Sequence, residues 1–74
     1  MRKTNPLDPA LPVWTTDDGS PLSCTEKIKV LNENMREIEA LVRDMLEDGV
    51  LMGCSDPQMR SALKALVDSV TLRF

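Results

Sequence analysis

The sequence predicts an all-α protein: an antiparallel two-helix hairpin preceded by an extended, proline-rich arm. Apolar residues recur alternately four and three apart along residues 24–45, which is the spacing of one helix face. A second stretch, residues 59–70, also carries apolar residues at helical spacing. Four of the five prolines lie before residue 22, where they exclude a helix interior. We therefore divide the chain into an arm, residues 1–22, and a helical hairpin, residues 23–74.

The arm is expected to be extended, because proline fixes φ and biases the residue before it toward extended geometry. Asp18 and Gly19 indicate a turn near residues 17–20. The arm also carries Trp14, the one tryptophan of the chain. We expect Trp14 to act either as a lid over the first helix or as an anchor on another protein, since tryptophan is enriched at interface hot spots.

The first helix is expected over about residues 24–52, and Ser23 and Glu26 have capping-box spacing at its start. Its heptad core positions are Cys24, Ile28, Leu31, Met35, Ile38, Val42 and Met45. Either Gly49 or Gly53 could end this helix. We favour Gly53, because a helix that stopped at Gly49 would leave the apolar triplet "VLM" in an exposed loop.

The second helix is expected over about residues 56–72. Ser55 or Asp56 can cap it, and Pro57 lies in the first turn, where its missing N–H costs nothing. Only two or three residues around Cys54 then connect the helices, and a connection this short makes them antiparallel neighbours.

The two helices differ in length, roughly 43 Å against roughly 25 Å at 1.5 Å per residue. The N-terminal end of the first helix is therefore left without an intrachain helix partner. The arm could cover it, or a second copy could dock there to form a four-helix bundle, and we expect a homodimer. The predicted partner-binding residues are Trp14, Ile28, Val30 and Leu31.

Composition argues against several functions. The chain has no histidine, the commonest agent of acid–base catalysis near neutral pH, so we expect no enzyme and no cofactor. The carboxylates of "RDMLED" lack the glycine-bent loop of Ca²⁺ sites, and we expect no metal. A net charge of −3 disfavours phosphate-backbone binding and leaves a nucleic-acid-binding regulator as a third hypothesis. No apolar run is long enough for a membrane helix.

Two cysteines, and a start that lacks a signal-peptide core, predict a cytoplasmic protein with reduced thiols. Cys24, at the start of a helix, could be a reactive thiolate, so a thiol-based redox sensor or reactive-cysteine protein is the competing function. Alternatively, Cys24 is a small residue of the core. The favoured function is a non-enzymatic protein–protein interaction module, an accessory or regulatory subunit of a larger protein.

Overall fold

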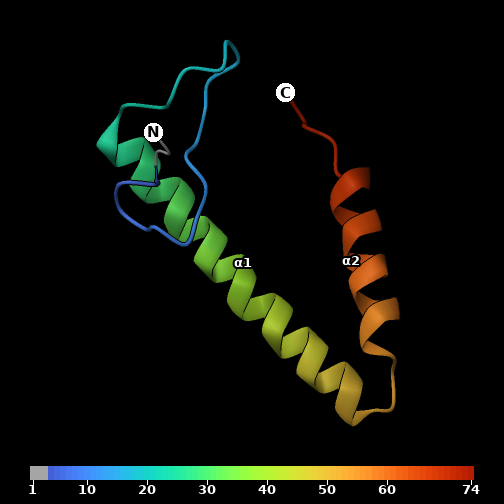
Figure 1. Ribbon diagram of the computed structural model, residues 1–74. Coiled ribbons are helices and arrows are strands. Elements are labelled where there is room, and N and C mark those ends of the chain that lie inside the picture. Colours follow the sequence, from blue (N-terminus) through green and yellow to red (C-terminus); the bar gives the residue numbers. More distant parts are fainter. Residues whose placement is uncertain (1–3) are drawn as a thin grey trace. The chain divides into compact units, whose positions relative to one another are not determined.

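The computed structural model describes residues 4–74 and confirms the all-α helical hairpin (Figure 1). Helix α1 spans Thr25–Leu51 and helix α2 spans Asp56–Ser69, and the two pack against each other. Residues 1–3 of the predicted arm lie outside the described residues. Within the described part, neither helix combines the length and the apolar character needed to cross a membrane.

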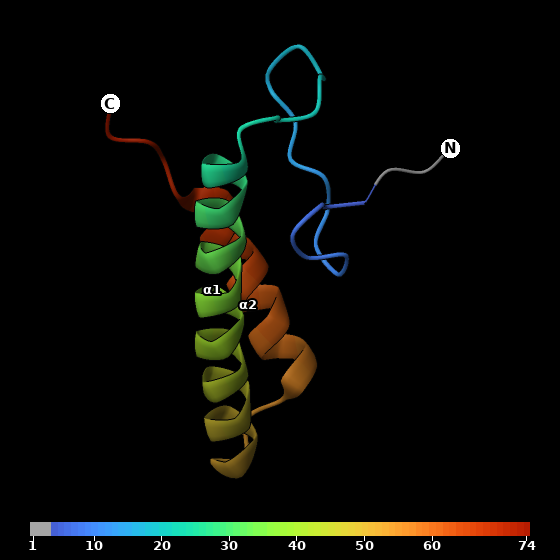
Figure 2. The same ribbon diagram turned by 90° about the vertical axis from the view of Figure 1, so that its left-hand side faces the viewer.

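The chain folds as two compact units that divide within α1, between Glu39 and Ala40. The N-terminal unit combines the arm with the first part of α1, and the arm loops beside the first turns of that helix (Figure 2). The C-terminal unit combines the rest of α1 with α2.

The arm reverses direction at the predicted turn. Thr15 and Pro21 form an isolated antiparallel bridge, and the N–H of Leu22 donates to the Trp14 carbonyl at 2.7 Å. Gly19 occupies this turn with a φ of 87°, which glycine adopts without the steric penalty of a Cβ. The turn brings the chain back toward α1 immediately before the helix begins.

Helix α1 begins one residue later than the capping-box pattern predicts. Its first helical hydrogen bond runs from the Ile28 N–H to the Cys24 carbonyl at 3.0 Å, so Thr25 is the first helical residue. Cys24, rather than Ser23, therefore stands at the N-cap position.

Gly53 terminates α1, whose last helical residue is Leu51, and the sequence predicts this terminator. Gly53 has a φ of 90°, its N–H donates to the Val50 carbonyl at 3.0 Å, and the Cys54 N–H donates to the Gly49 carbonyl at 2.8 Å. These two bonds form a Schellman motif, which satisfies carbonyls of the last helical turn. Gly49 stays inside the helix.

Helix α2 begins as predicted and ends earlier. Ser55 is its N-cap and accepts the Gln58 N–H on its side-chain oxygen at 3.4 Å. The helix ends at Ser69 rather than at residue 72, and Val70 is extended with a ψ of 128°. The Ser69 hydroxyl donates to the Leu66 carbonyl at 2.8 Å, and such local side-chain bonds compete with helix continuation.

Each unit has a small apolar core. Among the described residues the buried hydrophobic side chains are Ile28, in the N-terminal unit, and Met59, in the C-terminal unit. Met59 packs directly on Gly49, where an added Cβ would overlap the methionine sulfur. Leu46 and Leu63 are half-buried in the same unit. So little apolar burial leaves most of the hydrophobic surface of both units exposed to solvent.

Candidate protein-binding surface

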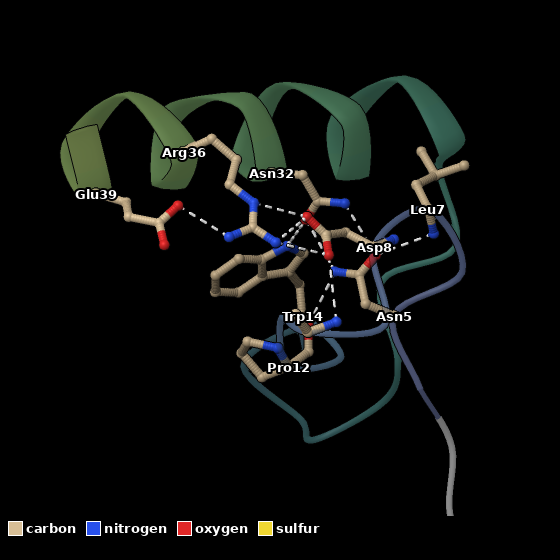
Figure 3. A network of polar contacts seen from close by, with 9 residues as sticks. Asn5, Leu7, Asp8, Pro12, Trp14, Asn32, Arg36 and Glu39 are labelled. Atoms are coloured by element: carbon tan, nitrogen blue, oxygen red, sulfur yellow. Dashed lines mark hydrogen bonds and ion pairs between the residues drawn. The ribbon is translucent and has the colours of Figure 1, made fainter.

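A buried pair of asparagines fastens the arm to α1 (Figure 3). The amide of Asn5 donates to Asn32 at 2.8 Å, and the amide of Asn32 donates back to Asn5 at 2.9 Å. Asn5 is 1% exposed and Asn32 7%. Burying amides costs free energy unless their polar atoms are paired, and every buried side-chain nitrogen and oxygen within residues 4–74 has a partner.

Asn5 also organises its own loop. Its side-chain oxygen accepts the backbone N–H groups of Leu7 and Asp8 at 3.1 and 3.2 Å. Its amide additionally donates to the Pro12 carbonyl at 3.0 Å. One side chain thus holds both ends of the loop over residues 5–12, and the Asn32 contact then attaches this ordered loop to the helix.

Trp14, which follows the loop over residues 5–12, also bonds to Asn32. Its indole N–H donates to the Asn32 side-chain oxygen at 2.8 Å, and its ring is half-buried. Indole N–H groups normally find a partner when they are buried. An intrachain partner for this N–H supports the lid interpretation of Trp14 over the anchor interpretation.

An ion pair adds a third contact between the arm and the helix. Arg36 lies one turn after Asn32, and its Nε and Nη2 donate to the two carboxylate oxygens of Asp8, each at 2.9 Å. Arg36 also donates to Glu39 at 2.9 Å, and these bonds to Glu39 and Asp8 raise the pKa of Arg36 above its ordinary value. The pair is exposed, so its geometry orients the arm more than its energy stabilises it.

Asp18 fixes the turn of the arm electrostatically. Its carboxylate accepts the Thr16 hydroxyl at 2.6 Å and the Ser20 N–H at 2.9 Å. These hydrogen bonds, that from Thr16 first, lower the pKa of Asp18 from 3.8 to about 2. Bonds to the charged form favour that form, so this turn prefers an ionised Asp18.

Beside the arm, the N-terminal unit leaves an open apolar groove of about 420 Å³. Leu22, Val30 and Leu31 line it, with Glu26 and Lys27 at its edges. Val30 is 54% exposed and Leu31 38% exposed. Two large aliphatic side chains left this open on one helix face form a surface that a partner could cover.

The four sequence-predicted binding residues therefore fall into two groups. Val30 and Leu31 line the groove and are exposed. Ile28 is 5% exposed, and Trp14 uses its N–H within the arm. The surface open to a partner is thus narrower than the predicted set, and Leu22 joins it.

Sequence reasoning missed the network that holds the arm, whose members are Asn5, Asp8, Asn32 and Arg36. A signal was present, because Asn32 lies one helical turn after Ile28 at the edge of the apolar stripe. A polar side chain at that place indicates a polar partner from another segment. Asn5 and Asp8 each precede a proline, a pattern typical of turns.

Both cysteines are exposed free thiols. Cys24 is thus accessible at the start of α1. The alternative expectation, that Cys24 is a small core residue, is wrong. Cys54 lies after α1, with its sulfur 3.6 Å from the Gln58 side-chain oxygen. Within residues 4–74, no group of three or more His, Cys, Asp or Glu side chains is arranged to hold a metal ion.

In comparisons with known proteins, no family model, no curated protein and no solved structure matches this chain.

Proposed function

We propose that the protein is a non-enzymatic interaction module, an accessory or regulatory subunit that binds a larger protein through the N-terminal part of α1. The partner would lay an amphipathic helix into the groove lined by Leu22, Val30 and Leu31, a common mode of peptide recognition. Glu26 and Lys27 would meet polar residues at the rim of the interface. The exposure of Val30 and Leu31 beside an ordered arm is the observation that carries this proposal.

The arm supports the proposal by making the groove rigid. The Asn5–Asn32 pair and the Trp14 contact hold the arm against the same helix that presents the groove. A surface that is already ordered loses less conformational entropy when it binds. The arm would then position the binding face, and Trp14 would act as its lid.

The remaining functional predictions have narrower support. Free thiols in both cysteines are compatible with a cytoplasmic location. The exposure of Cys24 favours the thiol hypothesis only by making the sulfur accessible. The net charge of −3 disfavours binding to the phosphates of a nucleic acid. Self-association, the second half of the partner prediction, was expected at the N-terminal end of the first helix, and the groove of the C-terminal unit offers a different surface for it.

The test compares two identical substitutions on exposed valines of α1, Val30→Asp in the groove and Val50→Asp outside it, where Val50 is 52% exposed. Tagged wild-type chain and both variants are used to capture proteins from the lysate of the native host. A protein that is retained is identified, purified and titrated against each chain by calorimetry. Circular dichroism first establishes that each variant is helical.

We expect one protein to bind wild type and Val50→Asp and to lose at least about tenfold in affinity for Val30→Asp, because a carboxylate would enter an apolar interface. A protein that binds Val30→Asp as tightly as wild type would refute the groove as the site. Failure of the wild type to bind any protein would refute the subunit proposal.

A further inference from the structure

The C-terminal unit, Ala40–Phe74, is small and has little apolar packing of its own. It buries one hydrophobic side chain, Met59, within the described residues. Units below about 40 residues usually need disulfides, a metal or oligomerisation to fold. Because both cysteines are free thiols and no metal-binding cluster occurs among residues 4–74, oligomerisation is the stabiliser that this unit can use.

The same unit carries an apolar groove of its own, about 630 Å³ in volume. Val42 of α1 and Leu63 and Val67 of α2 line it. The groove runs along the contact between the two helices of the hairpin, where a further helix could pack against both. Its apolar residues lie at positions that a four-helix bundle would cover.

The charges around this groove suit contact with a copy of itself. Arg60, Lys64 and Asp68 border it, and Arg60 is paired within α2 with Asp56 at 2.7 Å. A two-fold interface places one patch against the same patch, so a rim of a single sign would repel itself. This rim has both signs, and Asp68 of one copy can face Lys64 of the other.

We infer that a second copy of the chain docks its own hairpin in this groove, giving a two-fold four-helix bundle. The C-terminal unit has apolar surface for such an interface to bury. Leu41 of α1 and Leu66 and Val67 of α2 are each at least 59% exposed, and apolar side chains left exposed together indicate a surface that a second protein covers.

This dimer surface is separate from the groove at Val30 and Leu31, and the inference does not depend on the proposed partner. Sedimentation equilibrium of the full chain over a wide concentration range tests it. We expect wild type to approach twice the monomer mass of 8.3 kDa. Val67→Asp should sediment as a monomer, and Val30→Asp, the matched control, should remain a dimer.

The hairpin can depend on the dimer for folding, so Val67→Asp can also lose helicity. Val67→Ala then tests the interface without introducing a charge. It removes two carbon atoms that the interface would bury in each copy and should weaken dimerisation on the order of a hundredfold. Monomeric wild type at every concentration, a trimer or larger assembly, or dissociation by Val30→Asp with Val67→Asp still dimeric would each overturn the inference.

Discussion

Replacing Asn32 with alanine should release the arm from α1. The substitution removes the acceptor of the Trp14 N–H and both hydrogen bonds to Asn5. Asn5 keeps its bonds to Leu7, Asp8 and Pro12. The free-energy cost therefore comes mainly from two donors left without an acceptor, the Trp14 indole N–H and one amide hydrogen of Asn5. At about 1–3 kcal/mol for each buried group left unpaired, the arm should lose about 2–6 kcal/mol of docking free energy.

Because Trp14 is the one tryptophan of the chain, its fluorescence reports the arm directly. Asn32→Ala should shift its emission to longer wavelength and increase quenching by acrylamide. Amide exchange at Leu7 and Asp8, which donate to Asn5, should accelerate if the loop opens as well. Helicity measured by circular dichroism should persist, since alanine is a better helix former than asparagine.

Asn34→Ala is the matched control, because it makes the same chemical change on an exposed position of the same helix. It should leave the Trp14 signal unchanged. If Asn32→Ala gave the same emission and quenching as Asn34→Ala, the amide pair would not be what holds the arm.

Two further perturbations test the turns. Gly53→Ala should lower the free energy of unfolding by about 1–2 kcal/mol, because a Cβ is strained at a φ of 90°, and an unchanged thermal midpoint would contradict the Schellman end of α1. Asp18, with its pKa lowered from 3.8 to about 2, favours the folded turn above pH 3.8 and loses that contribution as the pH falls through 2. Thr16→Val should raise the pKa of Asp18 toward 3.8, and an NMR titration that gives the same midpoint in both chains would exclude the Thr16 hydroxyl as the main cause.

The sequence was most informative where local chemistry decides the structure. The heptad spacing determined α1, and the glycine at residue 53 determined its end because only a residue tolerant of positive φ suits that place. The end of α2 was predicted too late, since apolar spacing alone does not reveal the bond from the Ser69 hydroxyl to Leu66. Periodicity identifies helices better than it identifies their last turns.

The candidate site was harder to predict, because its contacts join residues far apart in sequence. Asn5 and Asn32 are 27 positions apart, and no periodic pattern connects an irregular arm to a helix. Ile28, one helical turn before Asn32, is buried in the same unit. Val30, by contrast, was predicted to lack an intrachain helix partner because the second helix is too short to reach this end of α1, and it is 54% exposed.

The Asn5–Asn32 pair also determines what could displace the arm. Neither amide titrates, so acidity leaves this attachment unchanged, and among the described contacts between the arm and α1 salt weakens the exposed Asp8–Arg36 pair. The arm should therefore remain docked across wide ranges of pH and ionic strength. A molecule that competes for its place on α1 would have to offer Asn32 a neutral donor and acceptor side by side, as a peptide backbone or another carboxamide does, and a charged ligand would gain little there.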